Sequence, residues 1–277
     1  MQTLAEIREL LESRGMAPRK KLGQNFLLDH NLIRKLVDAS GVGDGDLVLE
    51  VGPGTGALTD ELLARGCEVI ACEFDAGLAA LQRERQATAT EAGRFTLIEG
   101  DCLAGKRGLN PAIVEAIGGR AFSLVANLPY GAATPLMLAL LCDSRCTGQF
   151  VTIQREVADR LLAGPGSKTY GSISVVAQTL ANVERVATLP PECFWPRPDV
   201  TSAMVSLRPI GGQGIDDRLA FAAFCQQVFA NRRKQLGKVL AGVLGDVSLP
   251  QGVAPTDRAE RLDVRTIAGL YRSTRGG

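Results

Sequence analysis

Short apolar runs alternate with amphipathic stretches along the first two thirds of the chain. The apolar runs read DLVLEVG, EVIACEFD and FTLIEGD, and the stretches between them read ALTDELLARG and AGLAALQRERQ. Two later apolar runs, FSLVANL and GQFVTIQ, continue the alternation. Such a pattern predicts an α/β fold with a mainly parallel sheet and helices on both of its faces. Ligands of that architecture bind beyond the carboxyl ends of the strands.

The pattern changes near residue 210. The stretch SLRPIGGQGIDD is rich in glycine and turn formers, and the sequence after it, LAFAAFCQQVFANRRKQLGKVLAGVL and then RAERLDVRTIAGLYR, spaces apolar residues three or four apart. We therefore predict two domains. Residues 1–210 carry the sheet, with an N-terminal segment at 1–45, and residues 211–277 form a small helical domain.

Composition narrows the class of protein. The 277 residues are 45% hydrophobic, which is enough for a globular core, and no run of about 18 apolar residues is present. The start, MQTLAEIRELLESRG, lacks the apolar stretch of a signal peptide, so we expect a cytoplasmic protein without a membrane span. No apolar seam is evident, and a monomer is expected. Seven cysteines without a CxxC pair and a single histidine, His30, disfavour a metal site and argue against mechanisms that need a histidine base.

The net charge of +1 is unevenly distributed. Residues 1–35 hold 7 basic and 4 acidic side chains, residues 36–217 hold 14 and 22, and residues 218–277 hold 10 and 4. Two basic ends around an acidic middle are compatible with a polyanionic partner at the ends and a cationic ligand in the middle. Solvated helices would give a similar distribution.

A glycine-rich turn follows the first strand of the alternating region. Gly52, Gly54 and Gly56 form GxGxG, and Gly52, Gly54 and Ala57 also satisfy the dinucleotide pattern GxGxxG/A. Glycines at such a turn let the backbone approach a ligand where a Cβ would collide. The turn therefore predicts a cofactor of the adenosine type and does not distinguish one from another.

Two carboxylates end the next two strands. Glu73 lies seventeen residues after Gly56, near the position where a carboxylate accepts both hydroxyls of a ribose. Asp101 ends FTLIEGD and could accept a hydrogen from an adenine amino group. A nicotinamide cofactor would need a proton-handling His or Lys near its hydride site, and none is evident. S-adenosylmethionine needs no such relay, and an acidic middle region suits its sulfonium.

Taken together, several segments resemble the small-subunit ribosomal RNA adenine N6-dimethyltransferases, which are related to the erythromycin-resistance rRNA methylases. The matching segments are KKLGQNFL, VLEVGPGTGALT, EFD, GDCL, NLPY, QREVADRLLAGPGSKTYGSISV and FWPRPDVTSAMVSL, with a weaker match at NRRKQLGKVL. The resemblance implies a Rossmann-like, seven-stranded class I methyltransferase sheet that binds S-adenosylmethionine, followed by a small helical domain.

The resemblance also implies roles for individual residues. The cofactor-binding set is Gln24, Asn25, Leu27, Gly52, Gly54, Glu73, Asp101, Cys102 and Asn127. In this set Gln24, Asn25 and Leu27 flank the methionine end, Glu73 holds the ribose, and Cys102 lies with Asp101 at the adenine. Asn127 faces the end that carries the methyl group.

The motif NLPY suggests how an adenine N6 amine becomes reactive, since its lone pair is delocalised into the ring. We hypothesise that the Asn127 side-chain oxygen and the Leu128 carbonyl accept the two amine hydrogens, and that Pro129 fixes the turn. Transfer then depends on positioning more than on a base. Tyr130 and Phe194 are expected to stack on the two faces of the extruded base.

Basic residues at both ends are expected to contact small-subunit rRNA, in a precursor of the small ribosomal subunit. The candidates are Lys20, Lys21, Arg232, Arg233 and Lys234, the last three on a predicted helix. Contacts to phosphates would make binding strongly salt-dependent.

Three functions stay open on these residues. The first is dimethylation of two adjacent adenosines in the 3′-terminal hairpin loop of small-subunit rRNA, during ribosome biogenesis. The second is the same reaction on large-subunit rRNA, giving antibiotic resistance. The third is a ribosome-assembly factor that retains the fold without catalysis.

Overall fold

The computed structural model describes residues 2–105, 108–211, 214–244, 249 and 252–274. Parts of the two expected domain ranges that fall on other positions lie outside the described residues. By contacts, the chain divides into two compact units, Met1–Arg155 with Arg185–Ser206 and Glu156–Glu184 with Leu207–Gly277. The second unit thus takes in residues 156–184 as well as the C-terminal helices. A functional boundary at residue 210 stays a prediction.

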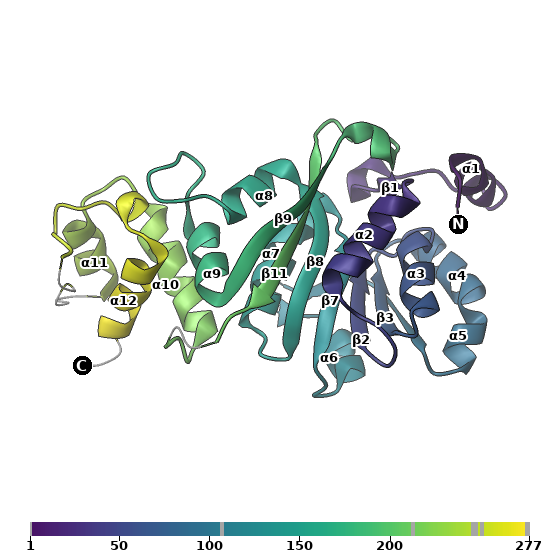
Figure 1. Ribbon diagram of the computed structural model, residues 1–277, viewed down its shortest axis with the longest axis horizontal. Helices are drawn as coiled ribbons and strands as arrows, with labels where there is room; N and C mark the ends of the chain where they lie inside the picture. The colour runs from purple at the N-terminus through teal and green to yellow at the C-terminus, as the bar shows by residue number, and fades with distance from the viewer. Residues whose placement is uncertain (1, 106–107, 212–213, 245–248, 250–251, 275–277) are drawn as a thin grey trace. The chain divides into compact units, whose positions relative to one another are not determined.

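The elements up to residue 154 alternate as the apolar pattern predicts (Figure 1). They are α1 (Leu4–Glu12), the 3₁₀ turn η1 (Lys20–Leu22), β1 (Phe26–Leu27), α2 (His30–Ser40), β2 (Leu47–Val51), α3 (Ala57–Ala64), β3 (Glu68–Glu73), α4 (Ala76–Arg85), α5 (Ala87–Glu91), β4 (Phe95–Glu99), β5 (Leu103–Ala104), β6 (Gly108–Leu109), α6 (Pro111–Ile117), β7 (Phe122–Asn127), α7 (Tyr130–Cys142) and β8 (Cys146–Gln154).

The remaining elements follow in chain order. They are α8 (Arg155–Leu161), α9 (Ser172–Leu180), β9 (Ala181–Leu189), η2 (Pro191–Cys193), β10 (Phe194–Trp195), β11 (Ser202–Pro209), α10 (Arg218–Ala230), α11 (Leu236–Leu244), η3 (Ala259–Arg261) and α12 (Val264–Ser273).

Among the described residues, seven strands form one sheet in the order β4-β3-β2-β7-β8-β11-β9. The neighbours from β4 to β8 pair in parallel, which confirms the predicted seven-stranded α/β sheet. From β2 the chain moves outward to β3 and β4 and then returns to β7 on the other side. The crevice at this reversal, beyond the carboxyl ends of β2 and β7, is where sheets of this kind bind ligands.

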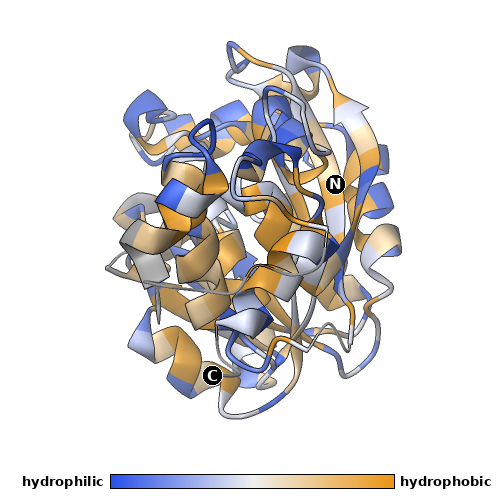
Figure 2. Cartoon of the chain, turned by 90° about the vertical axis from the view of Figure 1, so that its left-hand side faces the viewer, coloured by the Kyte–Doolittle hydropathy of each residue, from blue (hydrophilic) through white to orange (hydrophobic). Residues whose placement is uncertain are grey.

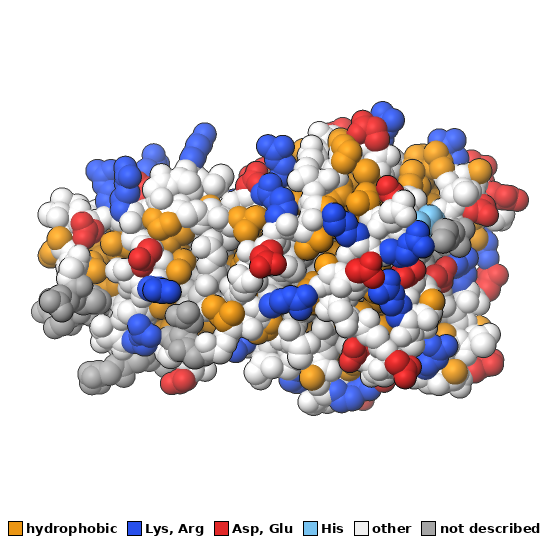
Figure 3. Space-filling view, viewed as in Figure 1, with side chains coloured by type: hydrophobic (Ala, Val, Ile, Leu, Met, Phe, Trp, Pro, Cys, Tyr) orange, Lys and Arg blue, Asp and Glu red, His pale blue; other side chains and the backbone are white. Residues whose placement is uncertain are grey.

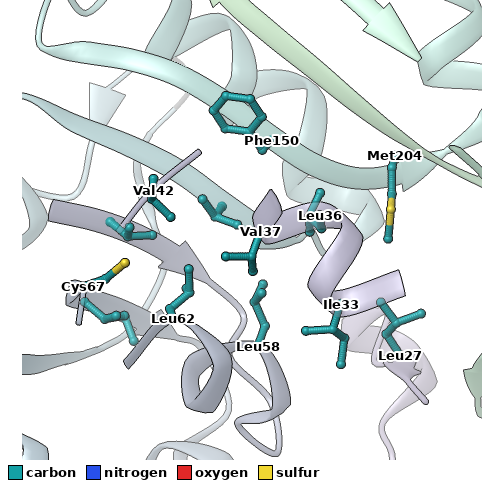
Figure 4. Packing of buried hydrophobic residues seen from close by; sticks show 14 of the residues in the cluster. Leu27, Ile33, Leu36, Val37, Val42, Leu58, Leu62, Cys67, Phe150 and Met204 are labelled. Carbon is teal, nitrogen blue, oxygen red and sulfur yellow. The ribbon is translucent and has the colours of Figure 1, made fainter. Parts of the chain in front are cut away.

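Apolar side chains of α2 and α3 cover one face of the sheet. Ile33, Leu36 and Val37 of α2 join Leu58 and Leu62 of α3 in a cluster that also contains side chains from the strands (Figure 4). Alternate strand residues point to the opposite face, where α6 contacts β3 and α7 contacts β8. Since both faces are covered, the strands read as unbroken apolar runs in the sequence.

Short polar residues set where the helices begin. Asp29, Asp75 and Asn110 accept hydrogen bonds from backbone N–H groups of the first turns of α2, α4 and α6. These side chains satisfy donors that have no partner inside the helix. The start of α4 is important for the site, because Asp75 lies two residues after Glu73.

The second unit is held together by aromatic side chains. Tyr170 is fully buried, packs edge-on against Phe229 of α10, and donates a hydrogen bond from its hydroxyl to the Leu262 carbonyl at 2.9 Å. Tyr271 of α12 contacts the rings of Phe221 and Phe224. Figure 2 shows hydrophobic residues interspersed with hydrophilic ones along the helices that face the viewer.

Within the described part of the chain, each helix is too short or too polar to cross a lipid bilayer.

Candidate active site

A cavity of about 610 Å³ opens at the carboxyl ends of β2, β3, β4 and β7. Its wall is formed by η1 and β1, by the glycine turn after β2, and by the residues that follow β3, β4 and β7. This volume lies in the range of small-molecule sites. The predicted cofactor-binding residues all line this cavity, as do Asn127, Leu128, Pro129 and Tyr130.

The glycine turn adopts backbone angles that only glycine accepts without strain. Gly52, Gly54 and Gly56 have φ values of 73°, 58° and 92°. A Cβ at Gly54 would also lie 3.0 Å from the Phe26 ring, and one at Gly52 would lie 3.2 Å from Pro129. The sequence GPGTG therefore brings this backbone against both β1 and the NLPY segment.

Glu73 ties the end of β3 to the glycine turn. Its two carboxylate oxygens accept hydrogen bonds from the backbone N–H groups of Gly54, at 3.1 Å, and Asp75, at 2.9 Å. The side chain is 6% exposed, and this burial raises its pKa, while the two backbone donors act in the opposite direction. Each oxygen keeps a second lone pair, so the carboxylate can accept two further hydroxyl hydrogens.

A second acid, Glu50, lies at the end of β2 on the cavity wall. Burial raises its pKa to about 8, although Thr59 donates a hydrogen bond to it at 2.7 Å. Glu50 is therefore protonated near neutral pH. The sequence motifs did not assign Glu50 a role. Its position inside the apolar run VLEV was the one sequence feature that indicated a buried acid.

The end of β4 supplies a polar and an apolar group. Asp101 accepts a hydrogen bond from the Leu103 N–H at 2.9 Å, and Asn110 donates to the Asp101 carbonyl at 2.7 Å. Burial raises the pKa of the Cys102 thiol to about 12, so it stays neutral and behaves as a small apolar group. A polar group such as Asp101 can bond to the edge of a purine, and an apolar group such as Cys102 can pack on its face.

The loop before β1 is fixed by hydrogen bonds of its own. Gln24 donates to Asp75 at 3.1 Å and accepts from the Arg19 N–H at 2.7 Å, so its amide already has partners on the protein. Arg19 also forms an ion pair with Asp75. Asp75 thus orders this loop as well as the start of α4, a role that sequence reasoning missed.

Asn127 has a fixed orientation. Its side-chain N–H donates to the Asn25 carbonyl at 2.9 Å, which leaves its oxygen as the group able to accept from a ligand. The Leu128 N–H donates to the Thr152 carbonyl at 3.1 Å and anchors the next peptide to β8. The contact between Asn127 and Asn25 spans 102 positions and unites two motifs that the sequence shows far apart.

Tyr130 and Phe194 differ in their access to the cavity. Tyr130 lines it, and its hydroxyl forms a 2.9 Å hydrogen bond with Ser202; burial raises the pKa of this phenol, which stays neutral. Phe194 is 2% exposed and belongs to the core cluster beside α2, opposite Leu27 in the β1–β10 pair. Its ring is not on the cavity wall, so the structure does not present the expected two-sided slot. Strand pairing of β10 with β1 is the reason.

A family model described as "Ribosomal RNA adenine dimethylase" matches residues 15–273. The chain belongs to the ribosomal RNA adenine dimethylase family. It is 39% identical over 272 residues to ribosomal RNA small subunit methyltransferase A of Phenylobacterium zucineum, covering 98% of this chain and 92% of the relative. It is 40% identical over 284 residues to the protein of that name from Leifsonia xyli, covering 97% and 95%.

Two solved structures support the fold of this dimethylase. A dimethyladenosine transferase from Plasmodium falciparum matches with a TM-score of 0.70 at 22% identity, over 88% of this chain and 95% of that one. The 23S rRNA methyltransferase ErmE matches with a TM-score of 0.65 at 21% identity, over 91% and 100%. The expected resemblance and the class I methyltransferase fold are confirmed, and the chain is an S-adenosylmethionine-dependent methyltransferase.

The basic residues of the dimethylase are only partly as expected. Lys20 and Lys21 are exposed on η1 at the cavity. Arg232, Arg233 and Lys234 lie in a turn between α10 and α11, so their placement on a helix was wrong. Figure 3 shows Lys and Arg side chains interspersed with acidic ones over the face in view.

Within the turn, Arg232 makes hydrogen bonds inside the second unit. Its guanidinium donates to the carbonyls of Tyr170 and of Lys168, the latter at 2.9 Å. It therefore holds the loop before α9 as a structural group, whereas Arg233 and Lys234 are exposed. The helical spacing of apolar residues on either side gave no sign of this long-range bond.

Proposed function

We propose that this dimethylase transfers methyl groups to the N6 amines of two adjacent adenosines in the 3′-terminal hairpin loop of small-subunit rRNA. It acts as a cytoplasmic monomer on a precursor of the small ribosomal subunit. The curated relatives named as small subunit methyltransferases, at about 40% identity over nearly the whole chain, favour this substrate over large-subunit rRNA.

The observation that carries the proposal is the orientation of Asn127. Because its N–H groups face the Asn25 carbonyl, its oxygen is directed to accept one hydrogen of an amine in the cavity. The Leu128 carbonyl accepts the other hydrogen. Two acceptors on one NH₂ group hold the nitrogen with its lone pair in a single direction, and such orientation can contribute several kcal/mol, as a rough magnitude.

The residues of the cavity fit S-adenosylmethionine, which supplies an electrophilic methyl group when bound. Glu73 offers a buried carboxylate with two free lone pairs for a ribose. Gly52 and Gly54 lie so close to Pro129 and Phe26 that a Cβ at either position would displace the turn that lines the cavity. Asp101 and Cys102 would hold the adenine. Asn25 and Leu27 line the cavity beside Asn127 and would flank the methionine end.

The aromatic ring of Tyr130 would stack on the extruded base. The hydrogen bond to Ser202 fixes the ring at the cavity wall. Phe194 would stack on the opposite face of the base only after β10 moves away from the core. Tyr130 is therefore the main stacking residue in this proposal. Lys20, Lys21, Arg233 and Lys234 would contact RNA phosphates.

The substrate is tested with labelled S-adenosylmethionine and purified precursor small subunits. We expect label in two adjacent N6,N6-dimethyladenosines near the 3′ end of the small-subunit rRNA, located by nuclease digestion and mass spectrometry. Labelling of large-subunit rRNA at an equal rate would support the resistance methylase instead. Cofactor binding without transfer to either RNA would support an assembly factor.

Replacing Tyr130 with alanine is expected to raise the KM for RNA about 10- to 100-fold, because a stacked base contributes about 1–3 kcal/mol. Tyr130→Phe keeps the ring and loses only the bond to Ser202, so it should stay within a few-fold of the wild type. Steady-state kinetics at saturating S-adenosylmethionine measure both variants. Equal KM values for the alanine variant and the wild type would contradict the stacking role.

A further inference from the structure

Two glutamine side chains hold the glycine turn from outside the cavity. Gln82 of α4 donates to the Gly54 carbonyl, and Gln2 donates to the Thr55 carbonyl, each at 2.8 Å. Gln82 is fully buried and Gln2 is 8% exposed. Neither belongs to the residues that line the cavity, so both act on a cofactor only through the turn.

The contact of Gln82 with the turn is direct. A Cβ at Gly56 would lie 2.8 Å from the Gln82 amide nitrogen, so the turn and this side chain are packed without intervening space. The backbone carbonyl of Gln2 is itself held, at 3.0 Å, by the His30 ring at the start of α2. The two amides therefore connect consecutive peptides of the turn to α4 and to α2.

Gln2 lies just before α1, and α1 packs against Phe26 of β1. Ile7 and Leu11, the buried residues of α1, pack in one cluster with Phe26, Leu78 and Leu81. The Phe26 ring is the group against which Gly54 lies most closely. Thus the segment 2–14 contacts the turn in two ways, through the Gln2 hydrogen bond and through the ring of Phe26.

The other side of Phe26 meets the segment that follows η2. Trp195 stacks on Phe26 with ring centroids 6.2 Å apart, and the Arg8 guanidinium lies 5.4 Å from the Trp195 ring. The exposed guanidinium and the ring attract each other as a cation and a π face. These contacts fix α1 over β1 and β10.

We propose that residues 2–14 form a strap that, together with Gln82 of α4, positions the glycine turn for the cofactor, and that Gln2 of the strap and Gln82 are the positioning residues. Residues 2–14 precede the part of the chain that the family model matches, residues 15–273, so the match does not assign them this role. A turn whose carbonyls are already held binds a ligand with a smaller loss of conformational freedom. The proposal rests on S-adenosylmethionine binding at this cavity.

The test compares Gln2→Leu and Gln82→Leu with the wild type. Each change removes one buried hydrogen bond and nearly preserves volume, so we expect the dissociation constant for S-adenosylmethionine, measured by calorimetry, to rise about tenfold. The KM for S-adenosylmethionine should rise equally, while kcat at saturating cofactor changes far less. Without cofactor, the backbone amides of residues 54–57 should exchange with deuterium faster in both variants.

Glu9→Gln is the matched control, because Glu9 is exposed on α1 and its change should leave all three measurements unaltered. A lower melting temperature for Gln2→Leu with unchanged affinity and unchanged exchange at 54–57 would overturn the proposal and make the strap merely structural. If Gln2→Leu fails to fold, Gln82→Leu tests the positioning of the same turn from α4. Hydrogen exchange is measured without cofactor and therefore tests the strap independently of the proposed function. Failure of the wild-type chain to bind S-adenosylmethionine would contradict the proposed function and would not bear on the exchange result.

Discussion

Asn127→Ala is expected to lower kcat for methyl transfer by about 100-fold, which corresponds to about 2.7 kcal/mol of transition-state stabilisation. The alanine removes the oxygen that accepts one amine hydrogen and leaves the Asn25 carbonyl without its donor. The affinity for S-adenosylmethionine should fall much less, because Glu73 and the glycine turn are untouched. Single-turnover kinetics on precursor small subunits separate the methyl-transfer step from product release.

Asn127→Asp separates two roles of the side chain, which are to accept an amine hydrogen and to be oriented by its hydrogen bond to the Asn25 carbonyl. The carboxylate keeps oxygens that can accept an amine hydrogen, but it faces the Asn25 carbonyl with a second acceptor instead of a donor. We expect a rate between those of the wild type and the alanine variant. Asn182→Ala, a change at an exposed asparagine that pairs with Glu184, is the matched control and should leave the rate unchanged. A wild-type rate for Asn127→Ala would refute the orienting role.

The strands were predictable because a strand that is buried on both faces of the sheet has apolar residues at successive positions. Such strands appear in the sequence as unbroken apolar runs. The same holds for the glycine turn, since its positive φ angles and the nearby Phe26 and Pro129 admit only glycine at positions 52 and 54. Carboxyl ends of parallel strands meet at one edge, so the sequence alone predicts that Glu73, Asp101 and Asn127 surround one cavity.

Long-range pairings were not predictable in the same way. Nothing local to FWPRP reveals that Phe194 pairs with Leu27 and enters the core, and nothing local to NRRK reveals that Arg232 donates to carbonyls some 60 positions earlier. The role of Gln2 depends on a bond to Thr55 across 53 positions. In each case one residue type fits several environments, and the tertiary fold selects among them.

Glu73 has one feature that the sequence predicts and another that only the structure shows. Its position after an apolar strand indicates a ribose ligand, whereas its bonds to the Gly54 and Asp75 N–H groups are visible only in the structure. The carboxylate therefore shapes the turn that surrounds the cofactor as well as offering oxygens to it. Removing this side chain should harm cofactor binding in two ways at once.

Glu73→Ala is expected to weaken S-adenosylmethionine binding by about 100-fold or more, because hydrogen bonds to a charged acceptor contribute about 1.5–3 kcal/mol each. It also leaves two buried N–H groups without an acceptor. Glu73→Gln keeps the shape but has a single acceptor oxygen, so it should bind less tightly than the wild type and more tightly than alanine. Calorimetry measures all three proteins, and the glutamine variant keeps the test valid if alanine destabilises the fold.

We expect S-adenosylmethionine to bind the charged form of Glu73, and the pH dependence of binding tests this. Burial raises its pKa, so S-adenosylmethionine affinity should decline as pH falls, beginning above the pH at which an ordinary glutamate takes up a proton. Glu73→Gln should remove this component of the pH dependence. Glu99→Gln is the matched control, since Glu99 lies opposite Glu73 on the neighbouring strand, pairs with Arg83, and does not line the cavity. If Glu73→Gln kept the wild-type pH profile, the ribose contact would belong to another acceptor. The role of Glu73 would then be limited to holding the glycine turn.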